Sequence, residues 1–327
     1  MDDSTLYNSL EHASPMNSET VDSSQSQAIE DEIVELEERL EKAKARLNKA
    51  QVNQGPSTPP ATIPSSDGTG LHVYSDSLPT LTVPLTSSAH HFLLLLSDSA
   101  LPLGSFAFSS GLESYLAHTR PKSSFPAFLN FSLSSYASTT LPFVLAAHRH
   151  PIDLLELDDA LDAAIVCTVG RRASVAQGRA LLSIWDRSFR SALPAGASTA
   201  AVEVLKEFTV LLRATSSNIT TDLPTASAHL GPMFGAIAVI LGMSLRQTAY
   251  VFMLSHVKAL LSAAVRASMF GPYHAQKMLA SVEVQEGIQK VIEQEWETKI
   301  EDAGQSVPVM DLWIGRHEML YSRIFNS

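Results

Sequence analysis

Apolar residues recur every three or four positions from about residue 87 to the end of the sequence, and prolines interrupt this pattern at intervals. Because a proline ends or kinks a helix, these breaks divide the region into helices of ordinary length. Alternating β-branched runs of the kind that form strands are few. The pattern therefore predicts an all-α helical bundle, with helices at 90–97, 109–118, 125–141, 143–149, 157–191, 200–214, 233–241, 245–270 and 273–303 and a short terminal helix.

Composition separates this body from the residues before it. Apolar residues make up 45% of the chain and charged residues only 17%, so the bulk of the chain can bury a sizeable core. The first part of the chain, rich in Ser, Thr, Pro, Glu and Gln, has too little apolar surface to offset the entropy lost on ordering. We therefore expect a single helical-bundle domain at 87–327, preceded by a disordered segment at 1–25, a coiled-coil-like helix at 26–52 and a Pro/Ser/Thr-rich linker at 53–86.

The coiled-coil prediction rests on apolar residues that alternate at intervals of four and three between Ile29 and Ala50. The first half of this segment is acidic and the second half basic, which suits the helix macrodipole. Ala43 and Ala50 contribute little apolar area to the seam. A partner helix and a solvated single helix therefore both remain open.

Charge and cysteine content limit the classes of partner and compartment. A net charge of −11 and an isoelectric point near 5.4 argue against a nucleic-acid-binding protein, which presents a basic surface. The lone Cys167 excludes an intramolecular disulfide and agrees with a reducing compartment. Residues 2–4 are acidic and polar, so we expect no leader peptide there. The longest uncharged apolar stretch, 230–245, is too short to cross a bilayer. We expect a cytoplasmic protein that binds neither nucleic acid nor membrane.

Templates for catalysis and for metal binding do not fit the sequence. It contains no Gly-x-x-x-x-Gly-Lys-[Ser/Thr] loop, no Gly-x-Ser-x-Gly and no His-Glu-x-x-His. The pairs His90–His91 and His148–His150 come nearest to a metal cluster, but on a helix neither spacing puts both rings on one face. We therefore expect a protein that is not an enzyme, with no catalytic residues, no stably bound cofactor and no metal site.

Two segments at opposite ends of the body carry recognisable motifs. Residues 96–113 read Leu-Ser-Asp-Ser-Ala-Leu-Pro-Leu-Gly-Ser-Phe-Ala-Phe-Ser-Ser-Gly-Leu-Glu, in which Pro102 ends one helix and Gly104 permits the positive φ of a turn. Residues 315–327 read Gly-Arg-His-Glu-Met-Leu-Tyr-Ser-Arg-Ile-Phe-Asn-Ser. Both segments resemble the corresponding ends of the UreF family of urease accessory proteins. The resemblance covers 87–327 and leaves the N-terminal residues as an extension.

This resemblance implies a helical adaptor without catalytic chemistry of its own. Members of the family form a complex with a P-loop GTPase of the UreG type and a second scaffold of the UreD/UreH type. That complex delivers nickel to apo-urease, and the family member itself is usually a homodimer. The resemblance therefore implies that GTP hydrolysis and nickel carriage take place on the partners and that the complex handles the nickel.

The resemblance and the residue types also indicate which side chains contact partners. Arg266 stands where the family carries a Lys or Arg implicated in docking the GTPase. For Glu113, a capping role and a partner-facing role are both open, and the arginines near Gly178 form either a solvated face or an interface. Residues 309–327 mix aromatic, apolar and Arg side chains, which predicts that they bind the second scaffold. The predicted partner-binding set is Glu113, Arg171, Arg172, Arg179, Arg266, Arg316, His317, Glu318, Tyr321, Arg323 and Phe325.

Two rival hypotheses remain open at this point. One is a helical hydrolase or metalloenzyme that uses His229, Glu113 and Asp98. His229 also fits a capping or core position, which argues against this hypothesis. The other is a structural coiled-coil protein whose heptad helix is the working part.

Overall fold

The computed structural model describes residues 38, 41, 42, 85–119, 121–193, 199–217 and 226–326. The chain divides into two units, Met1–Leu78 and Pro79–Ser327. In the first unit, the described residues include an exposed ion pair between Glu38 and Lys42, 3.2 Å apart and one helical turn from each other. The remainder of the predicted heptad helix and the linker up to residue 84 lie outside the described residues, so the proposed domain bounds stay predictions.

The second unit is built from helices, and the residues described there contain no strand, which confirms the predicted all-α fold. Short 3₁₀ turns and one π-helical stretch, Trp185–Phe189, lie between or beside the longer helices. The α-helices are α2 Leu85–Ser97, α3 Leu112–Thr119, α4 Phe125–Arg149, α5 Leu154–Ala164, α6 Thr168–Ile184, α7 Thr199–Ser217, α8 Leu230–Ile240, α9 Leu245–Arg266, α10 Pro272–Leu279, α11 Val282–Glu295 and α12 Val309–Arg316.

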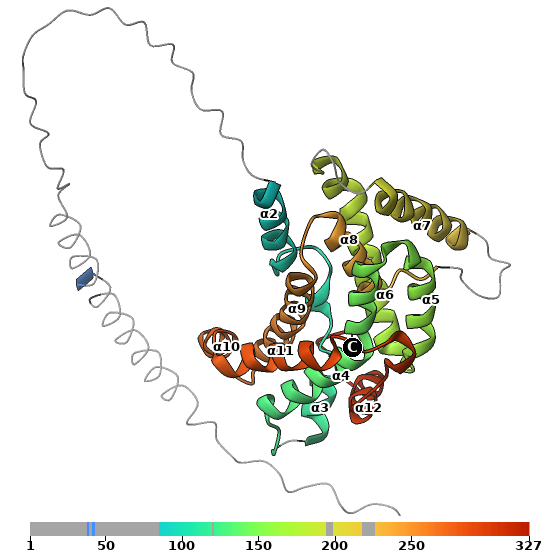
Figure 1. Ribbon diagram of the computed structural model, residues 1–327. Coiled ribbons are helices and arrows are strands. Elements are labelled where there is room, and N and C mark those ends of the chain that lie inside the picture. Colours follow the sequence, from blue (N-terminus) through green and yellow to red (C-terminus); the bar gives the residue numbers. More distant parts are fainter. Residues whose placement is uncertain are drawn as a thin grey trace, which may run out of the picture. The chain divides into compact units, whose positions relative to one another are not determined.

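The core of the bundle forms around α8, which is buried along almost its whole length. It packs mainly against α4 and α6 (Figure 1). Gly235 allows the close approach to α4, because a Cβ atom built there would lie only 2.2 Å from the carbonyl oxygen of Val144. Among the described helices, α9 is long and apolar enough to cross a bilayer, yet 56% of its most apolar stretch is buried inside the bundle. Burial in the core therefore accounts for its hydropathy.

Several predicted helix boundaries were wrong, each for a local reason. A break was predicted at Pro142, but α4 continues through it as one helix. Proline removes one backbone hydrogen bond there, while burial of Leu141, Pro142 and Phe143 holds both halves in the core. The predicted helix 157–191 is instead divided, since the backbone of Ile165 is extended after α5. The predicted helix 273–303 is divided at Ser281, whose hydroxyl caps α11 by accepting from the backbone N–H of Val284.

Three aromatic rings stack inside the bundle between α4 and α9. Tyr136 lies parallel to His256 on one side, with ring centroids 4.1 Å apart, and to Phe252, 5.2 Å away. His256 Nε2 also lies 2.8 Å from the hydroxyl of Ser132. Burial lowers the pKa of His256 to about 3, because a charged imidazole would lose its hydration there. The folded protein therefore keeps this imidazole neutral at physiological pH.

This buried histidine makes stability depend on pH. The folded pKa of about 3 lies below the unfolded value of about 6.5, so the unfolded state binds the proton more readily. Stability is then lost as pH falls through the unfolded pKa and continues to fall towards the folded one. We expect His256 to lower the free energy of unfolding by about 1 kcal/mol between pH 7 and pH 5.5. Denaturant unfolding of wild type and His256→Phe at both pH values measures this, and equal losses in the two proteins would contradict it.

Candidate partner-binding site

The C-terminal segment, residues 309–326, is held on the bundle by aromatic packing at its start. The ring centroid of Trp313 on α12 lies 4.8 Å from that of Tyr115 on α3 and 5.9 Å from that of Phe128 on α4. Met310 is buried on the same helix. Burial of these large side chains on α12 stabilises its docked position and thereby fixes where the residues that follow it begin.

The carboxylate of Glu113 holds the rest of the segment through hydrogen bonds. One oxygen, Oε2, lies 2.8 Å from His317 Nε2 and accepts from the backbone N–H of Phe325 at 3.2 Å, while Oε1 accepts from the N–H of Ile324 at 2.7 Å. The side chain of His317 is fully buried and that of Glu113 is 13% exposed. The carboxylate is therefore engaged within its own chain. Any effect of Glu113 and His317 on partners acts through the position of the segment.

Arg266 at the end of α9 holds the last residues. Its guanidinium lies 4.4 Å above the ring of Phe325, which is buried, and donates to the carbonyl oxygen of Phe106. The backbone N–H of Asn326 donates to Ala107 at 2.8 Å. A cation over an aromatic ring and main-chain hydrogen bonds together join α9, the turn at 105–107 and the C-terminus. The contact between Arg266 and Phe325 thus holds the end of the C-terminal segment against the bundle.

Several side chains of this segment are exposed. We call the following set the C-terminal surface: Leu312, Arg316, Glu318, Met319, Tyr321, Arg323 and Ile324. Tyr321 is completely exposed and Met319 is 81% exposed. Glu318 is paired with Arg172 of α6, and the hydrogen bond from that arginine lowers the pKa of the Glu318 carboxyl. Exposed aromatic, Met and Arg side chains are the types enriched where proteins bind one another. This surface can therefore form a protein interface.

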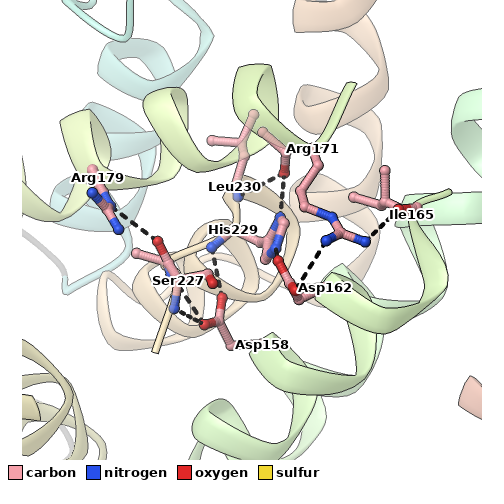
Figure 2. A network of polar contacts seen from close by, with 10 residues as sticks. Asp158, Asp162, Ile165, Arg171, Arg179, Ser227, His229 and Leu230 are labelled. Carbon is pink, nitrogen blue, oxygen red and sulfur yellow. Dashed lines mark hydrogen bonds and ion pairs between the residues drawn. The ribbon is translucent and has the colours of Figure 1, made fainter. Parts of the chain in front are cut away.

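The three predicted arginines of α6 have different surroundings. Arg171 donates to the carbonyl oxygen of Ile165 at 2.9 Å and lies 3.6 Å from Asp162. Arg179 donates from Nε to the carbonyl oxygen of Ser227 at 3.1 Å. Both side chains hold neighbouring loops of their own chain (Figure 2). Arg172 alone of the three reaches the C-terminal surface, through its pair with Glu318.

A buried polar network joins α5, α6 and the residues before α8 (Figure 2). Asp158 is 1% exposed. Its Oδ2 accepts from the backbone N–H groups of Ser227 (2.7 Å) and Ala228 (3.0 Å), and its Oδ1 accepts from His229 (2.6 Å). Hydrogen bonds from three N–H groups compensate the carboxylate for its lost hydration. Asp158 therefore fixes the path of the chain into α8.

His229 occupies the centre of this network. Its fully buried ring places Nε2 2.9 Å from Asp162 and Nδ1 3.1 Å from the hydroxyl of Ser174. Ala228 beside it has a φ of 67°, which is strained for a residue with a side chain. Gly178 makes room for that loop, because a Cβ atom there would lie 2.1 Å from the carbonyl oxygen of Ala228. The contacts give His229 the core-satisfied role.

The catalytic alternative gains no support from this geometry. His229 is bonded to Asp162 and Ser174, whereas Glu113 is bonded to His317 and the C-terminal backbone. Asp98 is exposed and accepts from the N–H of Ala100 in a turn. Within the described parts of the chain, no contact joins these three side chains, and no group of three His, Cys, Asp or Glu residues could hold a metal ion.

Sequence reasoning missed Asp158 and Asp162, although a signal was present. Leu154, Leu157, Asp158 and Leu161 follow the spacing of one helix face, and the three leucines are buried. An acidic residue on such a face must find hydrogen-bond donors in the core. That pattern identifies Asp158 as a buried anchor but does not reveal its donors, which come from residues 227–229.

Comparisons with known proteins agree with the fold and the motifs. The family model described as UreF matches residues 120–283. A protein of Schizosaccharomyces pombe, named as an uncharacterized urease accessory protein UreF-like, is 36% identical over 239 residues, which cover 72% of this chain and 97% of that protein. Urease accessory protein UreF of Paenarthrobacter aurescens is 31% identical over 71% of this chain and 95% of its own length. Urease accessory protein F of Oryza sativa subsp. indica is 29% identical over 70% and 82% of the two chains. The chain belongs to the UreF family of urease accessory proteins.

Proposed function

We propose that this protein is the adaptor of a urease-maturation complex. In this proposal it joins a UreG-type GTPase to a UreD/UreH-type scaffold, and the complex couples GTP hydrolysis to nickel loading of apo-urease. Membership of the UreF family supports a role in urease maturation. The sequence contains no phosphate-binding Gly-x-x-x-x-Gly-Lys-[Ser/Thr] loop, so hydrolysis belongs to the GTPase. The protein acts in the cytoplasm as a homodimer.

The observation that carries this proposal is the braced C-terminal surface. Its exposed residues include apolar, aromatic and cationic side chains on a short segment that Glu113, Trp313 and Arg266 hold in place. A surface ordered before binding loses less conformational entropy when a partner docks. We assign this surface to the scaffold, and we assign the exposed side of Arg266 and the adjoining end of α9 to the GTPase.

Substitutions on this surface test the proposal. We expect Arg323→Glu and Tyr321→Ala each to weaken scaffold binding by about thirtyfold, because central aromatic and Arg side chains each account for about 2 kcal/mol at interfaces. Both side chains are exposed, so neither substitution should change folding. Pull-down of the scaffold and the GTPase with the tagged full chain measures binding.

Arg187→Glu is the matched control, since Arg187 is exposed within the segment Trp185–Phe189 and lies outside the proposed surface. It should bind both partners like wild type. Arg266→Glu should lose the GTPase and also weaken scaffold binding, because it removes the support of Phe325. Full retention of both partners by Arg323→Glu and Tyr321→Ala would reject the assignment of the surface. Absence of any complex with folded wild type would reject the adaptor function.

A further inference from the structure

A cavity of about 160 Å³, partly open to solvent, lies where α4, α6, α8, α9 and α12 meet, and its lining includes the exposed Val166. Its lining comes from these five helices and from the turns around residues 103–110 and 164–167. Cavities of about 150 Å³ in protein cores admit molecules as large as benzene. This space can therefore hold an organic molecule of about seven non-hydrogen atoms or a small group of waters.

The lining of the cavity combines apolar and polar side chains. Phe234, Ile165, Leu230 and Ile314 are among the apolar residues that line it. Among the polar residues, hydroxyl groups and one imidazole from α4 and α9 line the space: Ser132, Ser135, Tyr136, Thr139, Ser255 and His256. Bundle cores are normally filled by apolar side chains. The hydroxyl groups in this lining therefore distinguish the cavity from the rest of the core.

Three of these hydroxyl groups have no hydrogen-bond partner within the described part of the chain: those of Ser135, Tyr136 and Ser255. These three remain accessible to a molecule the size of water inside the cavity, since each residue lines it. They can therefore pair with water or with a bound molecule that offers a hydrogen-bonding group.

The charges around the cavity exclude an ionic occupant. Burial keeps the pKa of His256 at about 3, so its ring is neutral, and burial raises the pKa of the Tyr136 hydroxyl. Asp311 is the single acidic residue among the described residues of the lining, and burial raises its pKa although Gln305 donates to it. No Lys or Arg of the described part of the chain lines the space. An anion would meet no cation there, and a metal ion would meet one carboxylate and lose its hydration.

We propose that this cavity is a binding site for a small uncharged molecule that combines an apolar body with one hydrogen-bonding group. The apolar side chains of the lining take the body, and the hydroxyl groups of Tyr136, Ser255 and Ser135 pair with the polar group. Because Met310, Asp311 and Ile314 of α12 form part of the lining, the bound molecule also supports the helix that carries the C-terminal surface. This site is independent of the adaptor function proposed above.

Phenol is the probe, because it combines an aromatic ring with one hydroxyl group and carries no charge at neutral pH. Benzene lacks the hydroxyl group, whereas acetate and nickel chloride test the charged classes. Saturation-transfer NMR and calorimetry with the full chain measure binding of each. We expect phenol to bind saturably with a dissociation constant of about 1 mM or tighter, and benzene to bind at least about fivefold more weakly.

Tyr136→Phe removes one hydroxyl group and retains the ring stack, so it should weaken phenol binding about fivefold and leave benzene binding unchanged. Tyr273→Phe is its matched control, because Tyr273 is 91% exposed on α10, and it should bind phenol like wild type. Ala259→Leu places a larger side chain in the lining and should abolish binding of both aromatic probes. Hydrogen exchange of α12 should slow when phenol is bound.

Four results would overturn the proposal. Absence of saturable phenol binding to wild type would show that the cavity holds water only. Equal affinity for benzene and phenol would show that the hydroxyl groups of the lining do not select the ligand. Displacement of phenol by acetate or nickel would contradict the neutral site. Unchanged phenol binding by Tyr136→Phe would show that phenol binds elsewhere. This test remains valid even if Ala259→Leu fails to fold.

Discussion

Glu113→Ala is expected to release the C-terminal segment and to abolish copurification of the scaffold. The substitution leaves two backbone N–H groups, at Ile324 and Phe325, without their acceptor. It also removes the one hydrogen-bond partner that the fully buried ring of His317 has among the described residues. Loss of these three hydrogen bonds, one of them to the fully buried His317, costs about 3 kcal/mol in total. Chemical denaturation measures the loss of stability, and limited proteolysis detects the freed segment.

Two further variants test whether the effect of Glu113→Ala comes from loss of the carboxylate acceptor. Glu113→Gln keeps one oxygen as an acceptor, so it should retain part of the stability and part of the binding. Glu156→Ala removes an exposed acidic residue from the first turn of α5 and should behave like wild type, which controls for the change in net charge. Normal scaffold binding by a folded Glu113→Ala variant would contradict the role of this carboxylate in positioning the segment.

Asp158→Ala should destabilise the protein even more than Glu113→Ala does. It leaves the N–H groups of Ser227, Ala228 and His229 unpaired in the core, and it frees a residue with positive φ from the contacts that hold it. We expect a loss of about 4 kcal/mol. For a domain of this size, that corresponds to a fall in melting temperature of roughly 10 °C, measurable by circular dichroism or calorimetry.

Asp159→Ala is the matched control, because this neighbouring carboxylate on α5 is exposed. Its melting temperature should stay within about 1–2 °C of wild type. Asp158→Asn keeps one acceptor oxygen but turns an amide N–H₂ towards backbone donors, so it should also destabilise the fold. Equal melting temperatures for Asp158→Ala and Asp159→Ala would show that the loop before α8 does not depend on this carboxylate.

The fold class followed from the sequence because helical periodicity is a local property. Helix ends were harder to place, since tertiary packing overrides local signals. Pro142 illustrates this, because burial on both sides outweighs its missing hydrogen bond. Ser281 illustrates the reverse case, in which one side-chain cap divides a stretch that periodicity alone joins.

The candidate site could be predicted only in part, because contacts between residues far apart in the chain leave no local pattern in the sequence. Motifs at both ends of the body indicated Glu113 and the C-terminal residues, but sequence patterns do not show that they contact one another across 211 positions, as Glu113 and Ile324 do. Arg171 and Arg179 looked like interface cations because their residue type suits both interfaces and loop anchors. Their acceptors, the carbonyl oxygens of Ile165 and Ser227, are backbone atoms with no signature in the sequence.

The most direct test of the adaptor function is urease activation in cells that lack this protein and are supplied with nickel. We predict that deletion leaves urease inactive and that wild-type protein and the Arg187→Glu control restore activity. Glu113→Ala and Arg323→Glu, expressed at the wild-type level, should restore little activity. Full urease activity in the deletion strain, or full rescue by both variants, would contradict an adaptor that works through its braced C-terminal surface.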